Sequence, residues 1–168
     1  GDYSNALGDN SIANGTASIA VGTNSQTDGN NSISVGLSTS AIGNGSVAMG
    51  LNSTATGDGS VAMGANTEAS GNYSTALNNT TIASGSASFA SGLATEASGQ
   101  SSTAMGSLTT ASGFGSTAIG QHNVLNSGDT TTSFNLTNTA LSIGNGTSSA
   151  AKSDAFSVLF NGNTTAAG

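Results

Sequence analysis

The chain has 168 residues and a net charge of −7, with 5% charged residues, of which one is Lys or Arg and eight are acidic. A single basic residue cannot neutralise a phosphate backbone, which excludes nucleic acid and anionic membrane surfaces as electrostatic partners. The absence of cysteine excludes disulfides and thiolate metal sites, and we expect no metal or other cofactor. No apolar run approaches the ~18 residues of a membrane-spanning helix, so we expect no direct membrane insertion.

From the first residue onward, glycine recurs every fourteen positions through nine units. Within each unit a serine follows this glycine by three residues, an alanine by five and a second glycine by seven. The alanine is replaced once, by Ser34, and the second glycine once, by Asn78. A weaker second half repeats the pattern with serine or threonine and then usually alanine, and Asn123 is the exception in its Ser/Thr column. Such a fixed period indicates one small unit stacked on itself.

Each half-unit has the form (S/T)-x-A-x-G-x-x, with a small residue at every second position. A period of two is the period of a β-strand, so we predict one short strand and one turn in each half-unit. The serine and alanine columns would fill the narrow interior of a flattened roll, and glycine would supply the turns because it accepts positive φ. The sequence therefore predicts an all-β fold: a parallel β-solenoid of 14-residue repeats, with two strands per coil and nine coils over residues 1–126.

The outward positions of the two half-units differ in polarity, with thirteen of eighteen apolar in the first half and four of eighteen in the second. Burying each large apolar side chain contributes about 1.5–3 kcal/mol, which an isolated roll has no other way to obtain. We therefore predict obligate self-association around an axis parallel to the roll. The predicted interface residues are Val21, Ile33, Val35, Val47, Met49, Val61, Met63, Leu77, Phe89, Met105 and Ile119.

Residues 127–168 lose the repeat phase and are interpreted as a small β cap or connector with larger hydrophobic side chains. Phe134, Leu136, Ala140, Leu141 and Ile143 are interpreted as one possible strand, and Phe156, Val158 and Phe160 alternate as a second strand. An Asn-Gly turn signal follows each of these two segments. We expect this cap to seal the end of the solenoid.

Four patterns are similar to catalytic or ligand-binding motifs, and each has a simpler interpretation. G-x-G-x-x-A, as at 43–48, matches a dinucleotide-binding fingerprint, but that motif requires a helix and this chain shows no helical periodicity. Asp58, in the sequence Gly57-Asp58-Gly59, is similar to the aspartates of calcium-binding β-rolls, but those repeats have a period of nine residues, whereas this chain repeats every fourteen. His122 is the only histidine and lacks an orienting partner, while Glu68 and Glu96 lie two coils apart on an open polar face. We therefore predict that the protein is not an enzyme.

The repeat G-x-x-S-x-A-x-G-x-x-(S/T)-x-A-x resembles the head repeats of trimeric autotransporter adhesins, the YadA-like head, most closely at 43–50 and 57–64. The resemblance implies a left-handed β-roll, a homotrimer and an extracellular position on the bacterial cell surface. It also implies multivalent adhesion to a host matrix protein, a glycan or another surface ligand.

Two alternative functions remain open from the sequence. Segments 143–147 and 154–163 resemble a segment of phage tail fibres, large-virus proteins and some bacterial surface proteins that often precedes a self-cleaving chaperone domain. This resemblance favours a phage or large-virus receptor-binding fibre, carried on the virion, as the alternative to a bacterial adhesin. An ice-binding solenoid is a more remote alternative, suggested by the threonine column that includes Thr67 and Thr81, although the period of two points these residues inward.

Overall fold

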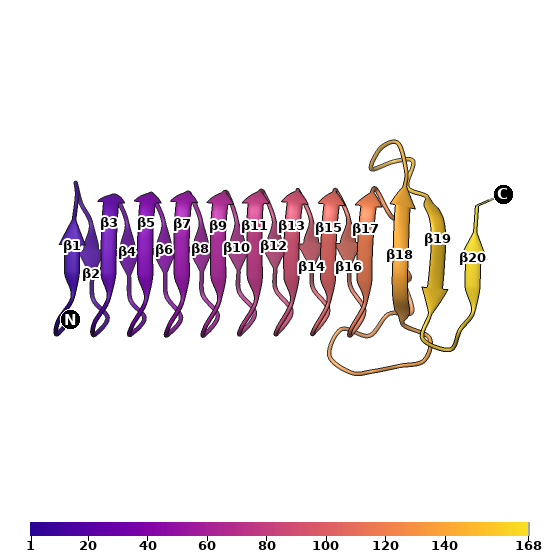
Figure 1. Cartoon of the computed structure of the whole chain (residues 1–168), viewed down its shortest axis with the longest axis horizontal. Helices are drawn as coiled ribbons and strands as arrows, with labels where there is room; N and C mark the ends of the chain where they lie inside the picture. The colour runs from indigo at the N-terminus through magenta and orange to yellow at the C-terminus, as the bar shows by residue number, and fades with distance from the viewer. Residues whose placement is uncertain (168) are drawn as a thin grey trace.

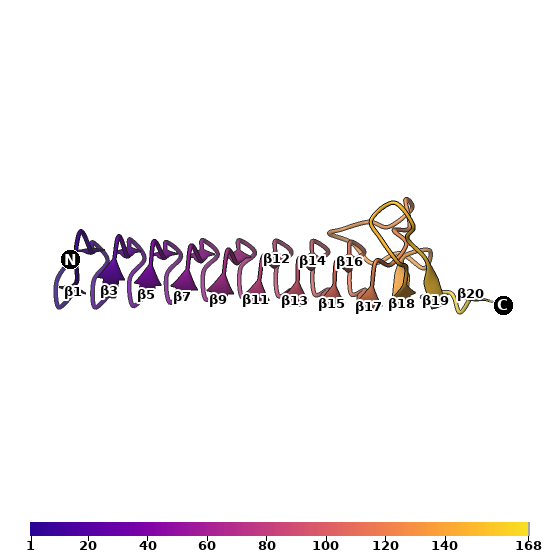
Figure 2. The ribbon, with the colours of Figure 1, turned by 90° about the horizontal axis from the view of Figure 1, so that it is seen from above.

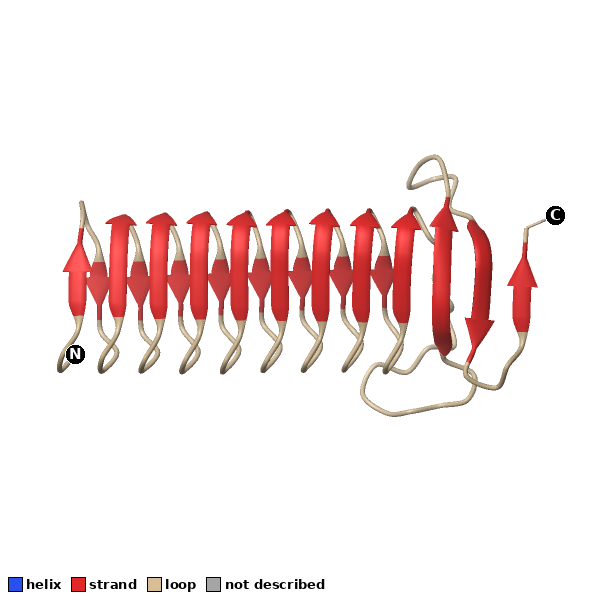
Figure 3. Ribbon diagram, viewed as in Figure 1, coloured by secondary structure: helices blue, strands red, loops and turns tan. Residues whose placement is uncertain are grey.

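The structure is a computed structural model that describes residues 1–167. These residues contain twenty β-strands and no helix, which confirms the all-β prediction (Figure 3). The strands form one sheet of twelve strands and one of eight. Through the repeats, successive strands of the chain belong to the two sheets in turn, and the two sheets are the two layers of a single roll (Figure 1). No helix of these described residues is long and apolar enough to cross a membrane.

The larger sheet contains the first strand of each coil and the smaller sheet contains the second. In the repeat region the larger sheet comprises β1 (Asn5–Leu7), β3 (Ile19–Thr23), β5 (Ile33–Leu37), β7 (Val47–Leu51), β9 (Val61–Ala65), β11 (Thr75–Asn79), β13 (Phe89–Leu93), β15 (Thr103–Ser107) and β17 (Thr117–Gln121). The smaller sheet comprises β2 (Ile12–Ala13), β4 (Gln26–Thr27), β6 (Ser40–Ala41), β8 (Thr54–Ala55), β10 (Glu68–Ala69), β12 (Ile82–Ala83), β14 (Glu96–Ala97) and β16 (Thr110–Ala111). Strands pair in parallel with a shift of one repeat, as in Ala48↔Ala62, which confirms the predicted solenoid of 14-residue repeats. The second strand is present in eight coils and missing from the ninth, so the prediction of two strands in each of nine coils is correct for eight.

Small side chains fill the interior of the roll, which is a thin body of two layers when it is seen from above (Figure 2). Ala48, Ala62, Ser46 and Ser60 are all 0% exposed in the single chain, so the prediction that these columns lie inside one chain is confirmed. The threonine column is also internal, with Thr67 only 1% exposed. Because these hydroxyls do not reach the surface, the threonine column cannot contact ice.

The two glycine columns have different structural roles. Gly50, in the second column, has φ +115°, and Asn78, which replaces glycine in that column, has φ 84°, as predicted. Gly43, in the first column, has no positive φ, so the prediction that this column supplies left-handed turns is wrong. A Cβ added to Gly43 would lie 2.1 Å from the carbonyl oxygen of Gly57 in the next coil. The first column therefore requires glycine because successive coils approach too closely for a side chain.

The left-handed corners of each coil are formed mainly by residues other than glycine. Asn52 and Asn66 have φ 52° and 55° at one corner, and Thr80 has φ 54° at the equivalent position of the next coil. Tyr73, at the other corner, has φ 58°. Asparagine tolerates this region better than other residues with side chains, whereas a β-branched residue such as threonine is strained there.

Three further strands extend the larger sheet beyond the repeats: β18 (Thr139–Asn145), β19 (Asp154–Leu159) and β20 (Thr164–Ala166). Phe134 and Leu136 lie in the loop before β18, so the first predicted strand of the tail is correct only from Ala140 onward. β18 pairs in parallel with β17, as another coil would, and β19 and β20 follow in antiparallel pairs. The loop between β17 and β18 lies on the side of the smaller sheet (Figure 2). The larger sheet thus continues into the tail, while the smaller sheet ends at β16.

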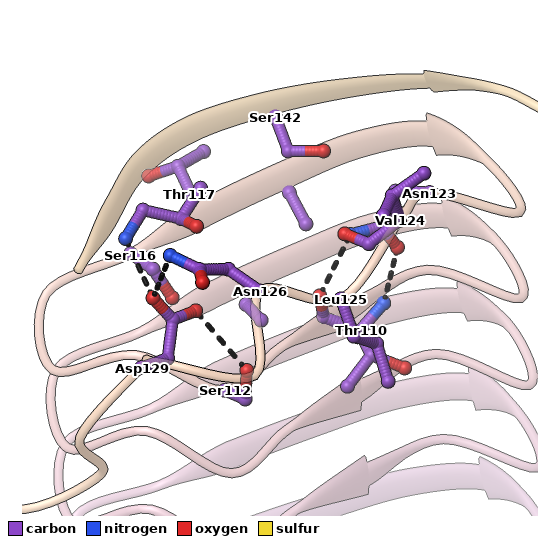
Figure 4. Close-up of a pocket in the computed structure, with 13 residues that line it drawn as sticks. Thr110, Ser112, Ser116, Thr117, Asn123, Val124, Leu125, Asn126, Asp129 and Ser142 are labelled. Atoms are coloured by element: carbon purple, nitrogen blue, oxygen red, sulfur yellow. Dashed lines mark hydrogen bonds between the residues drawn. The ribbon is translucent and has the colours of Figure 1, made fainter. Parts of the chain in front are cut away.

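The side chain of Asn123 ends the smaller sheet. Inside the repeats, the N–H of Glu96 donates to the carbonyl oxygen thirteen residues later, that of Thr109, at 2.9 Å. At the last short strand, the N–H of Thr110 donates instead to Asn123 Oδ1 at 2.8 Å, and Asn123 Nδ2 donates to the carbonyl oxygen of Thr110 at 3.0 Å (Figure 4). The amide thus replaces the next strand, and it closes an edge that would otherwise offer unpaired backbone groups.

We expect Asn123→Ser, which restores the residue type usual in this column, to destabilise the protein by about 1–3 kcal/mol. Serine is too short to reach both backbone groups of Thr110, which would be left without their partners at a nearly buried position. The measurement is the midpoint of thermal unfolding followed by circular dichroism. Asn163→Ser is the matched control, because Asn163 is exposed and its side chain has no hydrogen bond within residues 1–167; an equal loss in both variants would contradict the role of Asn123.

Candidate interaction face

The apolar residues predicted to form an interface lie in two columns on the outer face of the larger sheet. Parallel pairing places Val47 beside Val61 and Met49 beside Met63, and the same register holds along the roll. None of the eleven predicted interface residues is buried in the single chain, and Met63 is 40% exposed. We call the apolar members of these two columns the apolar stripe: Leu7, Ile19, Val21, Ile33, Val35, Val47, Met49, Val61, Met63, Leu77, Phe89, Met105 and Ile119.

A third, partly apolar column runs beside the stripe. Leu37, Leu51 and Leu93 are the last residues of β5, β7 and β13, and they are 46%, 41% and 50% exposed. This column was not predicted, because the strands were expected to end at the second glycine, whereas they continue one residue beyond it. The exposed apolar surface of the larger sheet is therefore wider than the sequence pattern indicated.

The stripe continues into the tail without a change of face. Ile119 pairs with Ile143 of β18, and Ile143 pairs with Phe156 of β19. Leu141 pairs in the same way with Val158. Because directly paired residues of neighbouring strands point to the same side of a sheet, these side chains extend the apolar columns. Phe156 and Val158 were expected to seal the end of the solenoid, and the pairing places them instead along the face of the larger sheet.

The outer face of the smaller sheet is mainly polar and carries the two glutamates considered above. Glu68 and Glu96 are exposed, and Ile82 lies between them in the same column. Residues 1–167 contain no group of three or more His, Cys, Asp or Glu side chains placed to hold a metal ion. Asp58 has a structural contact, since its Oδ1 accepts a hydrogen bond of 2.8 Å from the N–H of Asn44 in the preceding coil.

The remaining motif residues occupy structural positions. Gly45, in the G-x-G-x-x-A pattern, forms a left-handed corner with φ 64°, and the strand β7 begins two residues later. His122 was interpreted as a surface residue, but it is half-buried. Its Nδ1 is enclosed and has no hydrogen-bond partner among residues 1–167. A catalytic triad requires a hydrogen bond at each imidazole nitrogen, and Nδ1 has none within this described part of the chain.

Two cavities lie where the smaller sheet ends. One, of about 10 Å³, is lined by Asn123 and Asp129 among others, and it has room for a single water molecule (Figure 4). Asp129 Oδ1 accepts from the N–H of Thr139 at 2.7 Å, and its Oδ2 accepts from Ser112 Oγ at 3.2 Å. The other, of about 230 Å³, is an open recess against β19 and β20, where Asp154 Oδ1 accepts from the N–H of Val124 at 2.9 Å. Both carboxylates thus hold the tail in place.

Comparison with known families agrees with the repeat pattern. A family model described as the YadA head domain repeat (2 copies) matches residues 1–25, 13–39, 41–67, 55–77 and 97–123, together more than half of the chain. The stretch 78–96 lies between the last two matches. No curated protein matches the sequence significantly.

Proposed function

Because the chain belongs to the YadA head domain repeat family, we propose that it forms the head of a homotrimeric adhesin on the bacterial cell surface. Three copies associate through the apolar stripe, around an axis parallel to the roll. Equivalent residues of the three chains then lie at the same level along that axis. The head acts by binding and carries no catalytic residue.

The exposed stripe is the observation that carries this proposal. Its side chains lie on one face of the larger sheet, while the interior of the roll already consists of fully buried small residues. Side chains such as Met63 and Met105, each 40% exposed, have no place inside the roll. An exposed apolar surface of this length requires a partner, and further copies of the same chain offer the same periodicity.

The ligand-binding surface in this proposal comprises the outer faces left free by the trimer. The polar residues of the smaller sheet repeat once per coil, so a host matrix protein or glycan meets many similar contacts along the fibre. The exposed rings of Tyr3 and Tyr73, at 91% and 72%, add aromatic contacts at the corners. Weak individual contacts of this kind gain strength from the number of copies that bind together.

Met63→Glu is expected to convert the protein from trimer to monomer, a threefold loss of mass in sedimentation equilibrium. A charge at the centre of the stripe opposes burial, because an unpaired carboxylate is costly to remove from water. Binding to an array of matrix proteins and glycans should fall by about 100-fold or more as avidity is lost.

Thr54→Glu is the matched control, since Glu68 already occupies the next position of that outer column on the smaller sheet. This variant should remain trimeric. Far-UV circular dichroism establishes that both variants retain their β-structure. A monomeric unsubstituted protein, or two variants of equal mass, would overturn the assignment of the stripe as the interface.

A further inference from the structure

One of the two columns of the apolar stripe and the adjacent glycine column are each interrupted once. Ser91 stands where the other eight coils carry an apolar residue, and Asn78 stands where the other eight carry glycine. Both residues lie in the stretch 78–96, between two of the family-model matches. The two departures from the repeat therefore occur together, in neighbouring coils.

The two residues are bonded to each other on the outer side of the larger sheet. Asn78 Nδ2 donates to Ser91 Oγ at 3.2 Å, and Asn78 is exposed. The φ of Asn78, 84°, differs from the 142° of Gly64 and the 128° of Gly92 in the same column. At the glycine values a Cβ would meet the next coil, as a Cβ on Gly64 would lie 1.9 Å from the carbonyl oxygen of Asn78. The changed backbone angle thus accompanies a side chain that reaches the stripe.

A strictly periodic interface defines its axial register poorly. A slip of one coil, about 4.8 Å, places valine and methionine of one chain against the same residue types of another. The slip leaves one coil of each chain without a partner and preserves most of the contact. In coiled coils a single buried polar residue fixes the register, because any other alignment leaves its polar atoms against apolar side chains.

We propose that the Asn78–Ser91 pair fixes the axial register in which copies of this chain associate, a role that rests on the proposed self-association through the stripe. In register, the three pairs lie at one level, and each has an Asn78 Oδ1 and a Ser91 hydroxyl proton available for a neighbouring chain. After a slip of one coil, Ser91 of one chain faces Leu77 or Met105 of another. The polar atoms then lose their partners at a desolvated position.

The experiment measures register by disulfide formation between chains, for which this cysteine-free chain offers a clean background. Chains with Val21→Cys are mixed with chains carrying Met49→Cys, refolded together and oxidised, and the cross-linked products are identified by intact mass. These positions lie two coils apart, about 10 Å along the axis. That separation exceeds the ~7 Å limit between the Cα atoms of a disulfide. In register, only 21–21 and 49–49 products form, whereas a slip by one or two coils allows the 21–49 product.

The same pair of cysteine variants is then prepared with Asn78→Gly and Ser91→Met, the residue types of the other coils. The fraction of the 21–49 product should rise about tenfold or more, because a slipped alignment no longer leaves the polar atoms of the pair without hydrogen-bond partners. Thr103→Val, which removes a different polar residue from the stripe face, is the control and should leave the fraction unchanged.

Sedimentation equilibrium on each mixture separates the two hypotheses. Trimers in which the 21–49 product stays rare despite Asn78→Gly and Ser91→Met would overturn the register role while self-association stands. An equal rise with Thr103→Val would also overturn it, since any loss of polarity would then suffice. A monomeric protein without 21–21 product would overturn both self-association and the inference that depends on it.

Discussion

Adding one methyl group at Gly50 is expected to lower the free energy of unfolding by about 3–5 kcal/mol. The backbone there has φ +115°, which residues with side chains rarely adopt, and a Cβ would lie 2.1 Å from the carbonyl oxygen of Gly64. That oxygen belongs to the backbone of the paired strand β9, so it cannot move away without disturbing the ladder between β7 and β9. Gly50→Ala should therefore lower the thermal midpoint by about 10 °C at a fixed protein concentration.

Gly45→Ala is the matched control for this prediction. Gly45 also has a positive φ, 64°, but nothing lies within 4 Å of the position of its Cβ. Alanine already occupies the equivalent corner of two other coils, as Ala17 and Ala87, each with φ 54°. The control should cost about 1 kcal/mol or less, because the strain is partly offset by the lower entropy of the unfolded chain. Equal losses in the two variants would mean that φ alone, and not coil stacking, determines the need for glycine.

The repeat columns predicted the coil because they combine two independent periods. Fourteen residues define the coil, and alternation of small residues within it defines two strands and their inner faces, as Ser60 and Ala62 illustrate. The stripe followed from the same alternation. Its exposure in the single chain agrees with that reading, whereas its burial between chains stays a prediction.

The corners and the end of the smaller sheet were not predictable from these columns. The left-handed corners accept asparagine, alanine, serine, threonine, tyrosine and leucine, as at Ala94 and Leu108, so no residue type identifies them. Asn123 appeared only as an exception to a column. Its role depends on Thr110 lying in the last strand of the smaller sheet, and this depends on where the chain goes after the repeats.

The inner columns keep a constant side-chain size along the roll, whereas their hydrogen bonding varies from coil to coil. Ser18 Oγ donates to the carbonyl oxygen of Gly15 at 2.7 Å and Ser32 Oγ to that of Gly29 at 2.6 Å. In six later members of this serine column the hydroxyl has no hydrogen-bond partner within residues 1–167: Ser46, Ser60, Ser74, Ser88, Ser102 and Ser116. A hydroxyl that has a partner in some coils and none in others is tolerated because it is small. The width of the roll is thus the property that these columns preserve.

Ala62→Leu tests this width directly and is expected to cost about 1–3 kcal/mol in each chain, or about 3–9 kcal/mol in a trimer. Ala62 is 0% exposed, and it pairs with Ala48 in one neighbouring coil and Ala76 in the other. Leucine adds three heavy atoms to a row of buried alanines that has no space for them. The neighbouring coils cannot separate without breaking the backbone hydrogen bonds between their strands. The thermal midpoint, measured at one protein concentration, should fall accordingly.

Two substitutions close to Ala62 are expected to leave the midpoint within about 1 kcal/mol of the unsubstituted protein, for different reasons. Thr67→Val nearly preserves shape and removes a buried hydroxyl that has no partner among residues 1–167. Glu68→Gln changes an exposed side chain on the outer face of the smaller sheet. If Ala62→Leu were tolerated as well as these two, the alanine column would have to border open space, and a roll packed through its small columns would be excluded. If Thr67→Val were instead as costly as Ala62→Leu, the inner hydroxyls would carry the stability that is assigned here to the width of the roll.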